Sequence, residues 1–243
     1  MSYGHDYAME PVYSDGFAAD AALAERVAFI RRTYAHLFAA ILAFVGLLTV
    51  FFTVAPIKNA LVQLVVGSPW AFLGVFVAFL VVSFLADRWA QSDMSKPVQY
   101  LGLSLYTLAE AVIFVPLIWI AQRVGGDQII PTAGFLTLLI FGGLTLAVFI
   151  TKQDFSFLRT ALVIGSLGAL GLIVASLIFG FSLGIVFTVA MIVLLSGFIL
   201  YDTSNVLHHY RTDQHVAASL ALFASIATLF WWVIRLLMYL NSD

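Results

Sequence analysis

Long runs of apolar residues, separated by short polar segments, make up most of the chain. Most of these runs are close to the ~20 residues that an α-helix needs to cross the hydrocarbon core of a bilayer. The run at 70–85 is shorter and reaches that length only if residues 86–89 extend it. We therefore expect seven membrane-spanning segments, at residues 34–54, 70–85, 101–120, 132–150, 157–178, 185–202 and 216–240.

The apolar runs are continuous, whereas the strands of a membrane barrel would alternate between apolar and polar residues. In lipid, a helix satisfies all its backbone polar groups within one segment. The runs also show no internal repeat, which disfavours an inverted-repeat transporter. The pattern thus predicts an all-α membrane protein, a bundle of seven transmembrane helices.

Basic residues are distributed unevenly between the two sets of alternating loops. One set, with the segment before the first span, holds Arg26, Arg31, Arg32, Arg88, Lys96, Lys152, Arg159 and Arg211. The other set holds only Lys58 and Arg123. Because basic loops remain in the cytoplasm, we expect the N-terminus in the cytoplasm and the C-terminus outside.

The first 30 residues lack a long apolar run and carry acidic residues, tyrosines and small residues instead. No basic segment leads into an apolar core there, so the pattern of a signal peptide is missing. We expect a mobile tail at 1–18 and an amphipathic lead-in helix at 20–32. The chain then divides into a cytoplasmic tail with its lead-in helix at 1–30 and a membrane domain at 31–243.

Composition excludes several classes of function. Hydrophobic residues make up 63% of the chain and charged residues only 10%, which excludes a water-soluble domain. The net charge of −2 and the scattered basic residues provide no surface for nucleic acid. The chain has no cysteine, which excludes thiolate catalysis and zinc sites built with cysteine.

Motifs of catalysis and of cofactor binding are also missing. The sequence has neither a nucleotide-binding loop nor a zinc-protease helix motif, and no Ser, His and acid trio falls at one depth. His208, His209 and His215 are close in sequence but lack zinc-motif spacing, so we expect a solvated loop there. We expect no enzyme activity, no cofactor and no resident metal; an intramembrane hydrolase using Ser225 is the minor alternative.

Asp202 stands out because it places a carboxylate at the end of an otherwise apolar run. A charge at membrane depth is costly unless water, a cation or a proton relieves it, which favours a functional role; the alternative is that the helix ends at Leu200. At 1.5 Å per residue, Asp202 lies ~12 Å into the membrane, and Ser225 lies about as deep. The long side chain of Arg88 makes it the expected cationic partner of Asp202.

Glu110 lies deeper still, ~18 Å from the cytoplasmic end of its span. Such a carboxyl group either is protonated or faces a water-filled cavity. Arg235 lies near the outer end of the last span, where we expect its side chain to extend outward and not to pair with Asp202. Asp202, Glu110, Arg88 and Ser225 are therefore the candidate residues for pH sensing or for an ion path.

Three motifs resemble those of the Bax inhibitor-1 family, also called the transmembrane Bax-inhibitor-motif family. The sequence LYDTSNV at 200–206 resembles the sixth-span motif of that family. The sequences TKQDFSFL at 151–158 and RRTY at 31–34 are similar to those of its bacterial YccA branch. The resemblance covers most of the chain from Arg31 onward and leaves out the N-terminal tail.

The resemblance implies a seven-helix bundle around a central helix, in the inner membrane of a bacterium, with a proton-sensitive calcium leak. It also implies that the aspartate at Asp202 pairs with a second aspartate on the seventh span, where this sequence has Ser225. That departure weakens the case for calcium conduction. It favours the alternative that the protein, like the YccA branch, modulates the membrane protease FtsH without conducting ions.

Overall fold

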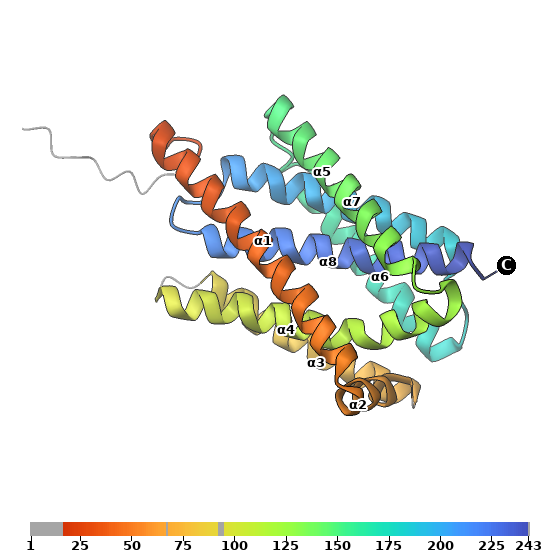
Figure 1. Ribbon diagram of the computed structural model, residues 1–243. Helices are drawn as coiled ribbons and strands as arrows, with labels where there is room; N and C mark the ends of the chain where they lie inside the picture. The colour runs from red at the N-terminus through yellow and green to blue at the C-terminus, as the bar shows by residue number, and fades with distance from the viewer. Residues whose placement is uncertain (1–16, 67, 92–94, 243) are drawn as a thin grey trace, which may run out of the picture.

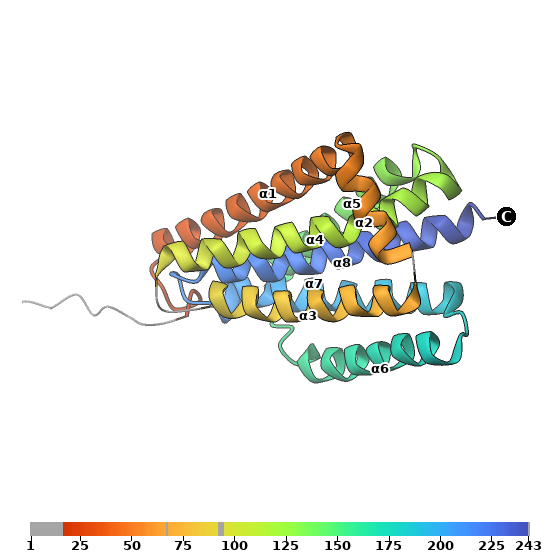
Figure 2. The same ribbon diagram turned by 90° about the horizontal axis from the view of Figure 1, so that it is seen from below.

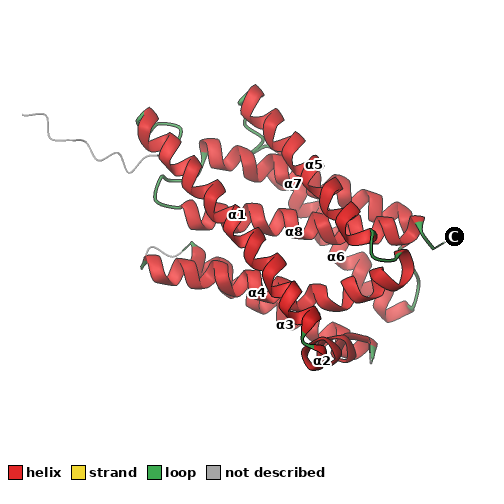
Figure 3. Cartoon of the chain, in the orientation of Figure 1, coloured by secondary structure: helices red, strands yellow, loops and turns green. Residues whose placement is uncertain are grey.

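The computed structural model describes residues 17–66, 68–91 and 95–242, and these residues form α-helices without a β-strand (Figure 3). The helices are α1 (Leu23–Thr53), α2 (Ala55–Val66), α3 (Pro69–Ala90), α4 (Lys96–Gly125), α5 (Ile129–Thr151), α6 (Leu158–Phe179), α7 (Gly184–His208) and α8 (His215–Leu240). Seven of these described helices are long and apolar enough to span a membrane. The predicted all-α fold with seven spans is therefore confirmed.

Two features at the start of the chain differ from the prediction. The lead-in segment and the first span form one continuous helix of 31 residues, α1. Pro56, two residues after the predicted end of that span, lies in the first turn of the 12-residue helix α2. Proline is tolerated there because the N–H groups of a first turn have no partner within the helix. The predicted tail lies mostly outside the described residues.

Helix α8 occupies the centre of the bundle (Figures 1 and 2). It packs against α1, α4, α5 and α7 and also touches α3. Small residues such as Ala217, Ala218 and Ala227 are buried along it and allow its neighbours to approach closely. Helix α6, in contrast, lies on the outside and packs mainly on α7 (Figure 2). The central helix is thus the seventh span.

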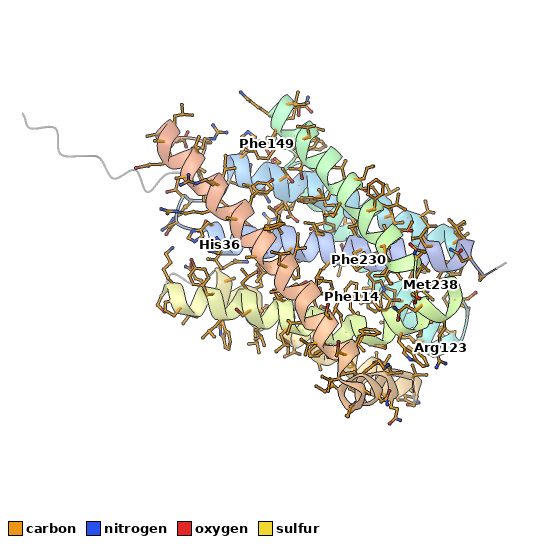
Figure 4. All side chains as sticks on the ribbon, viewed as in Figure 1. His36, Phe114, Arg123, Phe149, Phe230 and Met238 are labelled. Atoms are coloured by element: carbon orange, nitrogen blue, oxygen red, sulfur yellow. The ribbon has the colours of Figure 1, made fainter. Side chains whose placement is uncertain are left out.

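Aromatic rings fill the middle of the bundle. The ring of Phe114 on α4 contacts Phe44 on α1, at 5.0 Å between centroids, and stacks on Phe230 on α8, at 5.5 Å. Phe44 also contacts Phe223, at 5.9 Å. Figure 4 shows Phe114 and Phe230 in this central position. These ring contacts fix α1 and α4 against α8.

Helices α3 and α4 approach closely near the α3–α4 loop. A Cβ atom at Gly102 would lie 2.5 Å from the backbone oxygen of Ala86 and 2.8 Å from the backbone nitrogen of Ala90. No side chain larger than hydrogen fits there unless the helices separate. The other end of the bundle contains the turn at Gly180, whose φ of 72° is readily adopted by glycine and ends α6.

Candidate functional site

The carboxyl group of Asp202 meets the hydroxyl group of Ser225 between α7 and α8. Ser225 Oγ donates a hydrogen bond of 2.5 Å to Asp202 Oδ2. Both residues are buried, with 9% and 7% of their surface exposed. The structure thus brings into contact two residues for which the sequence predicts similar depths. A buried polar contact between two apolar helices is a place where a change of protonation alters helix packing.

A separate group of hydroxyls lies between α1, α5 and α7. The hydroxyl of Tyr34 on α1 is near those of Thr145 on α5 and Thr203 on α7. All three oxygens are shielded from solvent, and within the described residues none has a hydrogen bond of good geometry. Buried polar groups of this kind favour a water molecule or a cation as partner. They form a small buried polar group between α1, α5 and α7.

The loop between α5 and α6 docks on the end of α7 through Asp154. Asp154 Oδ1 accepts hydrogen bonds from the Ser156 backbone N–H, at 2.8 Å, and from Ser204 Oγ, at 3.3 Å. Asp154 Oδ2 lies 2.9 Å from His209 Nε2. Slight burial opposes ionisation, but the hydrogen bonds from Ser156 and His209 outweigh it and lower the pKa of Asp154 to about 2. The loop is thereby fixed to α7 at Ser204, two residues after Asp202 in the sequence.

The segment before α1 is attached to the same end of the bundle. The Ala18 N–H donates to the Tyr210 oxygen at 2.8 Å, and Arg26 donates to the Leu207 oxygen at 3.3 Å. Lys96 at the start of α4 donates to the Asp213 oxygen at 2.8 Å. We call this region, with Asp154, Ser204 and His209, the Asp154 end of the bundle. None of these long-range bonds was predicted from the sequence. The TKQDFSFL motif, which contains Asp154, was the sequence signal that could have drawn attention to this loop.

Arg88 does not pair with Asp202, so the predicted ion pair is wrong. Its side chain is exposed, and the guanidinium carbon lies 5.1 Å from the ring centroid of Phe84, one turn earlier on α3. The physical reason is that α3 packs mainly on α4 and presents Arg88 to the outside. Asp202 has the neutral Ser225 as its partner in place of a cation.

Glu110 lies apart from Asp202, on α4, with 3% of its surface exposed. It borders a cavity of about 660 Å³ that α3, α4, α6, α7 and α8 enclose. The structure therefore places Glu110 beside a cavity, and the walls of that cavity are mainly apolar. Arg235 borders the same cavity, and its guanidinium carbon lies 5.3 Å from the Trp232 ring centroid. We call this region, with the last turns of α4 and α8, the Arg235 end of the bundle.

The histidines do not gather into a metal site. In the described part of the chain, no group of three or more His, Cys, Asp or Glu side chains is arranged to hold a metal ion. His215 instead packs with His36 and Tyr100, with a Tyr100 Oη to His215 Nε2 distance of 3.3 Å. Figure 4 shows His36 on α1 at this side of the bundle. The contact joins α1, α4 and α8.

Comparisons with known proteins agree with this architecture. A family model described as "Inhibitor of apoptosis-promoting Bax1" matches residues 26–242. Bax inhibitor 1 of Schizosaccharomyces pombe is 31% identical over 231 residues, or 93% of this chain and 82% of the relative. A BI1-like protein of Arabidopsis thaliana is 30% identical, over 87% of this chain and 80% of the relative. An uncharacterised protein of Pseudomonas aeruginosa is 29% identical, over 83% of this chain and 84% of the relative.

The match to the family model extends over the seven spans of the described residues, including the region around Asp202 and Ser225. The matches to relatives extend across bacterial, fungal and plant proteins. With its fold and its matched length together, this multi-pass membrane protein belongs to the Bax inhibitor-1 family.

Proposed function

We propose that the protein is a pH-sensitive leak channel for cations, with Ca²⁺ as the permeant ion, and serves ion or stress homeostasis. The observation that carries the proposal is the buried hydrogen bond between Ser225 and Asp202. A proton added to Asp202 removes a negative charge from the α7–α8 contact and changes what Ser225 can donate to. That change biases an equilibrium between a closed and an open arrangement of the helices.

Other polar groups support a path for cations. Glu110 borders the cavity at the Arg235 end, and the hydroxyls of Tyr34, Thr145 and Thr203 lie close together between α1, α5 and α7. Carboxylate and hydroxyl oxygens are the ligands that Ca²⁺ prefers. In the proposed path, Glu110 lies towards one face of the membrane and Asp202 towards the other, so that an ion crossing the membrane passes both carboxyl groups. Asp202 senses protons, Ser225 is its hydrogen-bond donor, and the exposed Arg88 retains at most an electrostatic role at the membrane surface.

Calcium flux from liposomes tests this proposal. The purified protein should release Ca²⁺ at a rate that changes between pH 5 and pH 8, and Asp202→Asn should remove most of that change because Asn cannot titrate. Glu110→Gln should reduce the rate at every pH. Asp127→Asn, in the exposed turn before α5, is the matched control and should behave as wild type. The channel proposal fails if wild-type protein conducts at no pH in this range.

A second proposal is that the protein modulates the membrane protease FtsH without conducting ions. It is supported by Ser225, which stands where the resemblance implies an aspartate, and by the ordered loops of the Asp154 end, which provide a surface for a partner. Affinity purification from native membranes in mild detergent should recover FtsH. Recovery that survives Asp202→Asn but is lost when 152–157 is replaced by a Gly-Ser loop would favour binding through that surface.

We also propose that the protein lies in a bacterial inner membrane, with the Asp154 end in the cytoplasm. Basic residues near this end support the orientation, since Arg26, Lys96 and Arg211 all lie there. The chain contains no cysteine, so single cysteines introduced at exposed Ser156 or Ser182 report the orientation cleanly. In intact cells, an impermeant thiol reagent should label Ser182→Cys and not Ser156→Cys.

A further inference from the structure

Two cavities adjoin along the last turns of α8. The larger, of about 660 Å³, also contacts Glu110, and the smaller, of about 530 Å³, lies between α2, α3, α4 and α8. Both volumes fall in the range of roughly 300–1,000 Å³ typical of pockets that bind small molecules. The two cavities share Ile113, Trp231, Arg235 and Tyr239 as lining residues. They are therefore two branches that meet at one cationic side chain.

The other lining residues are mainly apolar. Phe76, Phe79 and Leu177 border the larger cavity, and Val75, Pro116 and Leu117 border the smaller. Such walls favour hydrocarbon over water. Glu110 borders only the larger cavity, and a carboxyl group there disfavours a second anion beside it. An anionic group is therefore expected at Arg235, and only an apolar group is expected to extend towards Glu110.

Arg235 lacks an anionic partner within the described residues. Its guanidinium lies over the Trp232 ring, and neither ion pair that the described residues form involves it. A guanidinium inside a membrane segment is costly without a counter-charge. Its planar set of N–H donors matches a phosphate group, which it binds through two parallel hydrogen bonds. Trp231 and Tyr239 beside it are residue types that lie at the level of lipid headgroups.

We propose that these cavities bind one anionic diacyl phospholipid from the surrounding bilayer. Arg235 binds the phosphate, and each of the two cavities takes one acyl chain. Two adjoining apolar branches and one cation at their junction match a molecule with two chains and one anionic headgroup. The site goes beyond the proposed channel function. A lipid bound there puts an acyl chain in the cavity beside Glu110 and so blocks the proposed cation path, and lipid binding itself does not require that the protein conducts ions.

Tryptophan quenching by brominated lipids tests the proposal. Full-length protein is placed in phosphatidylcholine nanodiscs, and a small fraction of the lipid is replaced by phosphatidylglycerol or phosphatidylcholine with brominated chains. Trp231 and Trp232 lie at the cavities, whereas exposed Trp70 and Trp89 report the general lipid surroundings. We expect the brominated phosphatidylglycerol to quench at about tenfold lower mole fraction than the phosphatidylcholine, because a charge-assisted pair of hydrogen bonds favours the anionic lipid.

Two variants test the role of Arg235 and of the cavities. Arg235→Gln should abolish the preference for the anionic lipid, and Ser176→Phe, which fills part of the larger cavity, should displace the bound anionic lipid and remove most of that preference as well. Arg123→Gln is the matched control, since Arg123 lies in the last turn of α4 and borders neither cavity. Its guanidinium carbon lies 3.7 Å from the ring centroid of Trp119. Figure 4 shows Arg123 at the same end of the bundle as Met238.

Equal quenching of wild type by the two lipids overturns the proposal. A preference that Arg123→Gln reduces as much as Arg235→Gln also overturns it, because general attraction to a basic surface then explains the result. If Arg235→Gln does not fold, the wild-type preference and its loss in Ser176→Phe decide the question. A wild-type preference that Ser176→Phe leaves unchanged places the anionic lipid outside the cavity and counts against the site.

Discussion

At the Asp154 end of the bundle, polar side chains and backbone groups from four separate segments are hydrogen-bonded to one another, whereas the Arg235 end is hollow and lined by apolar residues. Helices also pack more closely at the first end, where Gly102 brings α4 onto the backbone of α3. The contrast teaches that one membrane bundle combines a hydrogen-bonded, closely packed end near the sensor candidate Asp202 with a hollow end that has room for other molecules.

The largest predicted effect is at the closest helix contact. Gly102→Ala places a Cβ atom against the backbone of Ala86 and Ala90, and α3 and α4 must separate. We expect a loss of ~1–3 kcal/mol in stability, as in other overpacked cores. Thermal unfolding in detergent measures the loss. Gly142→Ala is the control, because its Cβ meets nothing within 4 Å; equal stability of the two variants would refute close packing at the Asp154 end.

A smaller effect is expected at the sensor candidate. Ser225→Ala removes the hydroxyl that donates to Asp202 and leaves a buried carboxyl group without that partner. The expected cost is ~1–2 kcal/mol, since hydrogen bonds inside membranes contribute little more than those in water. Thermal unfolding again gives the value. Thr228→Val, on the same helix, removes a hydroxyl that bonds only to the Ala224 oxygen and should change stability less.

The Asp154 network should give a modest pH dependence. The pKa of Asp154 in the folded protein is about 2, below its ordinary value of 3.8, so its ionised form is stabilised by folding. Its contribution is complete above about pH 4 and is lost as the pH falls towards 2. Because the pair with His209 is exposed, the contribution should stay below ~1 kcal/mol.

The difference in unfolding temperature between wild type and Asp154→Asn measures this contribution. The difference should be largest near neutral pH and should disappear by about pH 2. Asp127→Asn, which removes the same charge from the exposed turn after α4, is the control. A difference that grows towards low pH would contradict the sign of the predicted dependence.

The smallest effect is expected at the hollow end. Ser176→Val adds methyl groups beside the 660 Å³ cavity, where there is room for them. The Ser176 hydroxyl bonds only to the Ile173 oxygen of its own helix, so little is lost with it. We expect a change within ~0.5 kcal/mol, as for substitutions that create no strain. A loss as large as that of Gly102→Ala would show that the two ends are equally closely packed.

The sequence was sufficient to predict the spans because each is a continuous apolar run of the length that a membrane requires. Helix α2 was missed, since its 12 residues include Lys58 and Asn59 and are too few to cross. Similar depths were predicted for Asp202 and Ser225, because one short loop joins their two spans, and the structure adds that the two side chains are in contact. The depth of a residue does not specify how its helix is rotated about its own axis, which is why the predicted pairing of Arg88 with Asp202 was wrong.

The contacts of the Asp154 end could not be predicted, since they join residues far apart in the chain. Phe17 pairs with Arg211, and Asp154 bonds to Ser204 and His209. The cavities at Arg235 were beyond sequence analysis for a related reason. A cavity is the space that packed helices leave, and no single segment of the chain encodes it.

The central position of α8 has a consequence for biosynthesis. Of the eight helices, α8 is the last to leave the ribosome, yet it fills the axis around which the others pack. Helices α1, α3 and α4 can already pack on one another before α8 is inserted, but Asp202 has no Ser225 to bond to until then. The contact that carries the sensor candidate is therefore among the last that the described helices can form.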